Sequence, residues 1–292
     1  MGIYLLKSLL YGILEGVTEW LPVSSTGHLI LLESILSLNV GAEVHPQFAG
    51  EFKELFLVAI QLGAVLAVVT RYDARLFPVK GDRSAKKSAF DLWMRVLVGC
   101  VPAGVAGIVL DEVLESVTGK DMDGWLYNGF VVACMLILHG VLFIVVERIN
   151  RKSAPTVTDP TQISYAKAFG VGLFQMLSLI PGTSRSGSTI LGGMLSGLSR
   201  AAAAEFSFFM AVPVMLGACG IKTLGFIRFM LRNGLRMPGQ AMIVLAVAIV
   251  VAYVTSRLSI RFLMDFSAKH GFAPFGIYRI LLGAAVLVYH LL

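Results

Sequence analysis

Long apolar stretches separated by short polar segments make up most of the chain, and their lengths fall into two groups. A helix needs roughly 20 apolar residues to cross the hydrocarbon core of a bilayer. The stretches that reach or approach this length lie at residues 55–70, 92–110, 125–146, 206–227, 241–256 and 275–292. The stretches that are too short to cross alone lie at residues 1–14, 29–38, 165–180 and 188–198. The pattern predicts an all-α polytopic membrane protein.

The short stretches form two pairs, and each pair is joined by a polar loop. Residues 15–28 join the first pair, and residues 181–189 lie at the junction of the second. A short helix, a polar loop and another short helix are typical of a re-entrant hairpin. Irregular backbone at membrane depth is tolerated only where protein or a cavity covers it. We therefore expect both loops to be covered by the rest of the protein.

The two halves of the chain, 1–150 and 151–292, are similar to each other. A shift of 160 residues superposes Lys7 on Lys167, Gly12 on Gly172, Ser24 on Ser184, Gly27 on Gly187, Ile30 on Ile190 and Leu31 on Leu191. Each half would hold one re-entrant hairpin followed by three transmembrane helices. Because three crossings is an odd number, the second half would start on the opposite side of the bilayer. The sequence predicts a single integral membrane domain, 1–292, built as an inverted repeat.

Composition and charge agree with a membrane protein. Apolar residues make up 57% of the chain and charged residues 14%, whereas soluble domains contain about 25% charged residues. The net charge of +6 comes mainly from loops at 71–91, 147–167 and 257–270, which the positive-inside rule places in the cytoplasm with both termini outside. No basic stripe is interleaved with aromatic residues, so no nucleic-acid partner is expected. We expect residues 1–14 to be retained rather than cleaved as a signal peptide.

The first polar loop combines carboxylates, hydroxyls and an imidazole. It reads Glu15-Gly-Val-Thr-Glu19-Trp-Leu-Pro-Val-Ser-Ser-Thr-Gly-His28. Glu15 and Glu19 are four residues apart, so on a helix they share one face. The hydroxyls at residues 24–26 precede the next helix, where they are candidates for its N-cap. The free N–H groups and positive dipole end of a helix N-terminus suit an anion.

The second polar loop has the same character, with an arginine in place of the acids. It reads Pro181-Gly-Thr-Ser-Arg-Ser-Gly-Ser-Thr189. Arg185 can bind a phosphate through two parallel hydrogen bonds. On insertion scales each ionisable group at bilayer depth costs roughly 2.5–3.5 kcal/mol, so such groups are typical of functional sites. We expect the two loops to meet inside the membrane and to hold a diphosphate.

Together the two loops resemble the signature motifs of the bacterial undecaprenyl-diphosphate phosphatase family of the bacitracin-resistance type. The resemblance extends along the whole chain, including residues 60–64, 204–208 and 277–279. It implies an enzyme of the bacterial plasma membrane that hydrolyses undecaprenyl diphosphate to undecaprenyl phosphate and inorganic phosphate. This reaction recycles the lipid carrier of cell-wall synthesis. The site is expected to open to the extracytoplasmic side.

The resemblance also assigns roles to residues of the two loops. The catalytic residues that it implies are Glu15, Glu19, Ser25, His28 and Arg185. The phosphate-binding residues around them are Ser24, Thr26, Gly27, Thr183, Ser184, Ser186 and Thr189. We favour Ser25 as the nucleophile and His28 as its base, with direct attack by His28 or by an activated water as alternatives.

The charge of the expected substrate predicts a metal ion. A polyprenyl diphosphate lipid brings negative charges to a site that already holds two carboxylates. At an effective dielectric constant of about 20, each like-charge contact at about 4 Å costs roughly 4 kcal/mol. We therefore expect a divalent cation, Mg²⁺ or Ca²⁺, held by Glu15 and Glu19, or else one protonated glutamate.

A transport function is the alternative to an enzyme. A lipid-phosphate flippase or an anion transporter could use the same inverted-repeat cradle, because broken helices that converge at mid-membrane also hold anions in secondary transporters. The combination of glutamates, serine and histidine favours an enzyme, since transport needs neither a nucleophile nor a base. A homodimer is compatible with the sequence.

Overall fold

The computed structural model describes residues 1–79, 81–119, 126 and 128–291, and helices are the regular secondary structure of these residues apart from one isolated bridge between Val157 and Leu198. The first part of the chain forms α1 (Gly2–Thr18), α2 (Ser25–Ile35), α3 (Phe48–Arg71), α4 (Asp73–Leu76) and α5 (Arg83–Thr118). The second part forms α7 (Gly129–Asn150), η1 (Pro160–Gln162), α8 (Tyr165–Gln175), η2 (Met176–Leu179), α9 (Arg185–Leu195), α10 (Arg200–Arg232), α11 (Gly239–His270) and α12 (Ala273–Leu291). The predicted all-α class is confirmed.

Five of the described helices are long and apolar enough to cross a membrane: α3, α5, α7, α10 and α11. The last predicted span corresponds to α12, whose apolar stretch Ala273–Val288 is shorter than the spans of the other five helices. Several of the long helices extend well past the predicted apolar stretches. α5 has 36 residues, which at about 1.5 Å per residue is far longer than a hydrocarbon core of about 30 Å requires. Its first turns, rich in lysine and serine, continue the helix beyond the apolar part.

The four short apolar stretches form short helices, as the sequence predicts. α1 has 17 residues, and α2, α8 and α9 have 11 residues each. In the first pair, Leu21 precedes Pro22, a position that disfavours the helical conformation. In the second pair, η2 and then Pro181 and Gly182 interrupt the chain before α9 begins. Both breaks fall at the polar loops.

The structure consists of two compact units, each assembled from three separate segments. The first unit contains residues 1–20, 28–71 and 211–261, and the second contains residues 21–27, 72–210 and 262–292. Each unit therefore takes segments from both halves of the chain, and α10 and α11 each contribute to both units. The predicted repeat halves, 1–150 and 151–292, stay a prediction.

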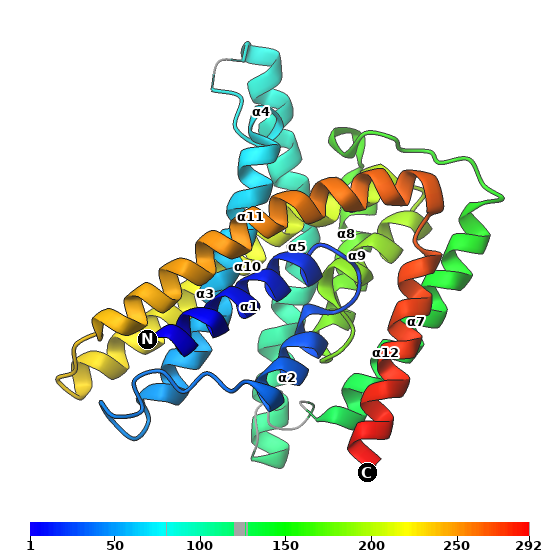
Figure 1. Ribbon diagram of the computed structural model, residues 1–292. Coiled ribbons are helices and arrows are strands. Elements are labelled where there is room, and N and C mark those ends of the chain that lie inside the picture. The colour runs from blue at the N-terminus through cyan, green and yellow to red at the C-terminus, as the bar shows by residue number, and fades with distance from the viewer. Residues whose placement is uncertain (80, 120–125, 127, 292) are drawn as a thin grey trace. The chain divides into compact units, whose positions relative to one another are not determined.

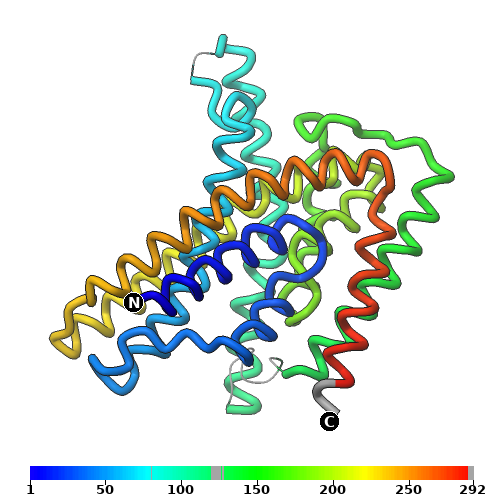
Figure 2. Tube along the Cα trace, in the orientation of Figure 1, coloured from blue at the N-terminus to red at the C-terminus, as the bar shows by residue number. Residues whose placement is uncertain are grey.

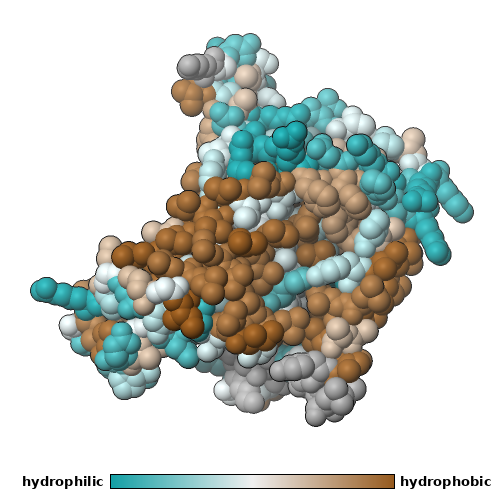
Figure 3. All heavy atoms as spheres, in the orientation of Figure 1, coloured by the Kyte–Doolittle hydropathy of each residue, from teal (hydrophilic) through white to brown (hydrophobic). Residues whose placement is uncertain are grey.

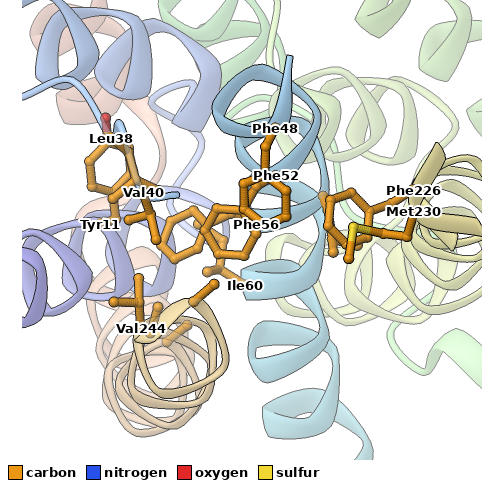
Figure 4. Close-up of a cluster of buried hydrophobic side chains, with 14 residues drawn as sticks. Tyr11, Leu38, Val40, Phe48, Phe52, Phe56, Ile60, Phe226, Met230 and Val244 are labelled. Atoms are coloured by element: carbon orange, nitrogen blue, oxygen red, sulfur yellow. The ribbon is translucent and has the colours of Figure 1, made fainter. Parts of the chain in front are cut away.

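The core of the first unit is a cluster of aromatic and aliphatic side chains from α1, α3, α10 and α11. Tyr11 meets the edge of Phe56 with ring centroids 5.7 Å apart, and Phe48 meets Phe226 at 5.8 Å (Figure 4). Close backbone contact adds to this packing, because a Cβ atom at Gly16 would lie 2.7 Å from the carbonyl oxygen of Ala252. Such small-residue contacts are typical of helix pairs in membranes.

The second unit uses the same kind of packing between α7 and α12, which lie side by side (Figure 1). Figure 2 shows the same pair as a Cα trace. A Cβ atom at Gly140 would lie 2.6 Å from the carbonyl oxygen of Gly276, so only glycine permits this approach. Likewise, α8 touches α5 where a Cβ atom at Gly172 would lie 2.2 Å from the carbonyl oxygen of Gly99. This packing positions α12 beside the polar loops.

The outer faces of the helices expose large apolar side chains. Along α11 in the first unit, Val250, Val254 and Leu258 are exposed, and Figure 3 shows brown, hydrophobic atoms over α1 and α11. Soluble monomers rarely expose contiguous apolar surface of this kind. The exposed apolar faces therefore agree with a protein that is embedded in a membrane.

Candidate functional site

Two serines precede the helices that follow the polar loops, and both have an unusual backbone conformation. Ser24 has φ 75° and Ser184 has φ 70°, and these are the positive-φ residues other than glycine within the described part of the chain. Positive φ is uncommon for residues with a Cβ atom, and such strain gathers at functional sites. The two serines are also the pair that the shift of 160 residues superposes.

Each serine caps the helix that follows it. The N–H of Gly27 donates to Ser24 Oγ at 3.3 Å, and the N–H of Gly187 donates to Ser184 Oγ at 3.1 Å. These hydroxyls satisfy N–H groups that a helix N-terminus leaves without intrahelical partners. The sequence predicted the hydroxyl-rich N-termini, and the structure identifies Ser24 and Ser184 as the residues that cap.

The two loops meet at the side chain of Arg279, which comes from α12. Arg279 is completely buried. Its Nη1 donates to the carbonyl oxygen of Pro22 at 3.3 Å, and its Nη2 donates to the carbonyl oxygens of Gly182 and Thr183, both at 2.9 Å. One guanidinium therefore binds the backbone of both polar loops within the second unit.

Helix α7 packs against both loops. Gly182 has φ 90°, and a Cβ atom there would lie 2.7 Å from the carbonyl oxygen of Val132. On the other loop, a Cβ atom at Gly27 would lie at ordinary van der Waals distance from the side chains of Val132 and Leu136. Gly182 therefore combines two requirements that exclude other residues: a positive φ and a close approach to backbone.

Arg185 is the first residue of α9, and α10 sets the direction of its side chain. Its Nη1 donates to the carbonyl oxygen of Ser207 at 2.9 Å. The hydroxyls of Thr189 and Ser207 lie 2.6 Å apart, and Thr189 Oγ1 also donates to the carbonyl oxygen of Arg185 at 2.9 Å. This arrangement fixes a half-buried guanidinium at a helix N-terminus.

Burial separates the hydroxyls of the site into two groups. Ser25 and Thr26, like Arg185, are only partly buried. Thr183, Ser186 and Thr189 are buried, and the hydroxyl of Thr189 is used inside the protein. Ser184 is partly buried, and its hydroxyl lies 3.2 Å from that of Ser186.

The two glutamates lie one helical turn apart at the end of α1. The N–H of Glu19 donates to the carbonyl oxygen of Glu15 at 3.0 Å, and both residues are buried. His28 lies in the first turns of α2 and is partly buried. These three residues belong to the first unit, whereas Ser25 and Arg185 belong to the second. Their meeting with Ser25 and Arg185 stays a prediction.

Other charged side chains of the second unit form ion pairs away from the two polar loops. Glu205 binds Arg75, and Arg200 binds Glu147. Glu147 also accepts a hydrogen bond from the N–H of Phe272 at 3.0 Å, so it ties α7 to the turn before α12. These ion pairs therefore brace the helices and leave Arg279 as the buried cation at the loops.

Comparison with known proteins supplies the family. The sequence matches the family described as "Bacitracin resistance protein BacA" over residues 8–285. The chain belongs to the BacA family. Its relatives include an "Undecaprenyl-diphosphatase" from Desulfitobacterium hafniense, which is 46% identical over 286 residues, covering 97% of this chain and 95% of the relative. A protein of the same name from Enterococcus faecalis is 46% identical over 290 residues, covering 98% and 97%. "Undecaprenyl-diphosphatase 1" from Clostridium acetobutylicum is 41% identical over 293 residues, covering 99% and 98%.

The structure adds two residues to the site of this BacA-family chain that sequence reasoning did not assign to it. Arg279 carried a signal, because it is a charged residue inside an apolar stretch and such residues are rare at membrane depth. Ser207 carried none, since its contribution to Arg185 is a backbone carbonyl oxygen. Any residue type at position 207 would supply the same acceptor.

Proposed function

We propose that this BacA-family protein is a membrane phosphatase that hydrolyses undecaprenyl diphosphate to undecaprenyl phosphate and inorganic phosphate. The reaction would return the lipid carrier to cell-wall synthesis. The observation that carries the proposal is the meeting of two hydroxyl-rich helix N-termini at one buried arginine. The names of the relatives, "Undecaprenyl-diphosphatase", support the same substrate and reaction.

The chemistry of the two loops fits a diphosphate. The helices α2 and α9 both begin at these loops, and helix N-termini attract anions through their N–H groups and dipoles. Arg185 adds a guanidinium that can bind two phosphate oxygens at once. Because one of its nitrogens is anchored on Ser207, the side chain is oriented before the substrate arrives.

For the reaction, the favoured nucleophile is Ser25. Its Oγ would attack the terminal phosphorus while His28 takes the hydroxyl proton, and the bond to the leaving undecaprenyl phosphate would break. After His28 has passed that proton to the departing phosphate, it would activate a water molecule that attacks the phosphoserine. The bond between phosphorus and Ser25 Oγ would break, the serine would regain a proton from His28, and inorganic phosphate would be released. Arg185 and the N–H groups at the loops would stabilise the charge on the transferring phosphoryl oxygens. Attack by His28, or by water without a covalent intermediate, gives the same products.

Glu15 and Glu19 supply only some of the ligands that a divalent cation needs. In the described part of the chain, no group of three or more His, Cys, Asp or Glu side chains is arranged to hold a metal ion. Two buried carboxylates one turn apart supply two ligands, and Mg²⁺ is often bound by one or two carboxylates together with substrate phosphates. Glu15 and Glu19 would therefore hold Mg²⁺ or Ca²⁺ together with the diphosphate. When bound, the cation would neutralise charge on the phosphate oxygens.

The finer membrane architecture is part of the proposal. The pairs α1–α2 and α8–α9 would be re-entrant hairpins related by an inverted repeat, each followed by three transmembrane helices. The basic segments at 71–91, 147–167 and 257–270, the last of which is helical in α11, would face the cytoplasm of a bacterial plasma membrane, and the site would open to the extracytoplasmic side. A homodimer remains a prediction as well.

The experiment that tests the function uses purified protein in detergent micelles and a polyprenyl diphosphate. Released inorganic phosphate is measured, with Ser25→Ala as the matched control. We expect phosphate release by the wild-type protein and a loss of at least about 10²-fold in the variant. Because a micelle does not separate two compartments, phosphate release in micelles cannot result from transport. Absence of phosphate release, combined with lipid translocation in vesicles, would favour the flippase alternative instead.

A further inference from the structure

We propose that Arg279 is a positioning residue of this site, which holds both polar loops in the conformation that binds phosphate without itself touching the substrate. The inference rests on the proposed function, because it assigns a role at the same site. It concerns a side chain on α12 that is 96 or more positions along the chain from the loop residues that it contacts.

The contacts of Arg279 reach both loops at the positions where their conformation is decided. The acceptors are the carbonyl oxygens of Pro22, two residues before Ser24, and of Gly182 and Thr183, directly before Ser184. Ser24 and Ser184 have positive φ angles. Strained conformations persist only where the surrounding structure fixes them. The Nη1 and Nη2 atoms of Arg279 supply such a constraint to both loops at once.

The hydrogen bonds also decide where one N–H group points. In a trans peptide the carbonyl and the following N–H point in opposite directions. The N–H groups of Val23 and Thr183 are bound within their own loops, to the carbonyl oxygens of Leu21 and Ile180. The third peptide places the N–H of Ser184 on the side away from Arg279. This N–H lies at the start of α9, next to Arg185, where a hydrogen-bond donor to the phosphate is needed.

The charge of Arg279 supports the same role. Throughout the described part of the chain, no carboxylate forms a salt bridge with Arg279, and its Nε has no hydrogen-bond partner. A buried cation without a counter-ion is strongly unfavourable in a medium of low dielectric constant. The carbonyl dipoles of the loops compensate it in part, and a bound diphosphate would compensate it further. The positive charge therefore favours an anion at the loops.

The guanidinium of Arg279 has no access to solvent. A Cβ atom at Gly187 would lie 3.4 Å from Arg279 Nη1, so the guanidinium packs under the first turn of α9. A shorter or differently shaped side chain at position 279 would leave the carbonyl oxygens of the loops without donors. The loops would then relax away from their strained conformation, and the Ser184 N–H would lose its direction.

Two substitutions test the proposal. Arg279→Met removes the charge and all three hydrogen bonds at similar volume, and Arg279→Lys keeps the charge but offers one nitrogen in place of two. We expect kcat/KM to fall about 10²-fold or more in the methionine variant, because a misplacement of about 1 Å in a catalytic geometry costs about that much. The lysine variant should fall between the methionine variant and the wild type.

Two further readouts separate positioning from a purely structural role. KM and the inhibition constant of inorganic phosphate are measured on monodisperse protein, with the melting temperature recorded in parallel. A structural brace would lower the melting temperature and the active fraction but leave KM and the phosphate constant unchanged. Positioning predicts that both constants rise. Arg200→Met is the matched control, since Arg200 pairs with Glu147 and touches neither loop; it should lower stability and leave both constants unchanged.

The outcomes also separate this inference from the proposed function. If folded Arg279→Lys and Arg279→Met both keep wild-type KM, kcat and phosphate inhibition, the positioning role is wrong while the phosphatase stands. If the wild-type protein releases no phosphate, the proposed function fails. Binding of inorganic phosphate, measured by calorimetry, then still tests whether Arg279 positions the two loops. Weaker phosphate binding in Arg279→Lys than in Arg200→Met would then support the positioning role, and equal binding would overturn it.

Discussion

The sharpest test of the loop geometry is the substitution Gly182→Ala. Gly182 lies in the second polar loop, and its carbonyl oxygen accepts a hydrogen bond from Arg279. Its φ of 90° is outside the usual range of residues with a Cβ atom, and the added methyl group would face the backbone of α7. The substitution therefore acts on the position of the loop without removing any functional side chain.

The size of the effect follows from two contributions. A left-handed backbone costs an L-residue roughly 1–2 kcal/mol relative to glycine. The added Cβ would also lie 2.7 Å from the oxygen, 2.8 Å from the Cα and 3.1 Å from the carbonyl carbon of Val132. Ordinary contacts between carbon atoms are about 3.5–4.0 Å, so the loop must move by about 0.5–1 Å. Because these three atoms are backbone, no rotamer change relieves the overlap.

A shift of this size next to Arg185 is expected to lower kcat/KM about 30- to 100-fold, which corresponds to roughly 2–2.7 kcal/mol of transition-state stabilisation. The assay is phosphate release from a polyprenyl diphosphate in detergent. Gly234→Ala is the matched control, because Gly234 also has a positive φ, 62°, but a Cβ atom there would have no neighbour within 4 Å. It carries the backbone strain without the overlap.

Comparison of the two variants separates the effect of backbone strain from the effect of the overlap with α7. If both variants fold but only Gly182→Ala loses activity, the approach of the loop to α7 sets the site geometry. If Gly182→Ala folds with wild-type kcat/KM, the loop tolerates displacement, and the argument that its position determines phosphate binding is refuted.

Three further predictions concern the chemistry. Phosphoenzyme trapping should label Ser25, and Ser25→Ala should abolish the label along with turnover; a label on His28 would identify the alternative nucleophile. Arg185→Lys should raise KM and lower kcat, by about 10-fold or more together, because an ammonium does not reproduce the two parallel hydrogen bonds of a guanidinium; unchanged constants would remove Arg185 from the phosphate site. Removal of bound metal by a chelator should inactivate the protein, and added Mg²⁺ or Ca²⁺ should restore activity; full activity after chelation would exclude the metal at Glu15 and Glu19.

The hydrophobic pattern predicts much of the fold because the length of an apolar stretch is a local property. It locates the short helices α1, α2, α8 and α9 and the breaks between them. The lengths of α5, α10 and α11 are missed, since polar helix-forming residues continue each helix beyond its apolar part. The composition of the two units is not predictable from this pattern either. Each unit joins segments that are far apart in the sequence.

The candidate site divides in the same way. Local sequence predicts that hydroxyls cap the helices after both loops, because a hydroxyl before an apolar run is a recognisable helix start. The structure identifies Ser24 and Ser184 among these candidates. The role of Arg279 does not follow from local sequence, since it depends on a contact with Pro22 across 257 positions. Periodicity and spacing describe neighbours along the chain, and they contain no information on which distant backbone a buried guanidinium will bind.

The choice of serine at positions 24 and 184 connects these two levels. Glycine would adopt the positive φ at both positions with less strain, but it has no hydroxyl to accept the N–H of Gly27 or Gly187. The chain therefore accepts backbone strain in exchange for a capped helix start in each loop. That arrangement needs support from elsewhere in the protein, and the three hydrogen bonds of Arg279 supply it next to both serines. The strained serines and Arg279 thus act together, which accounts for a charged residue within the apolar helix α12.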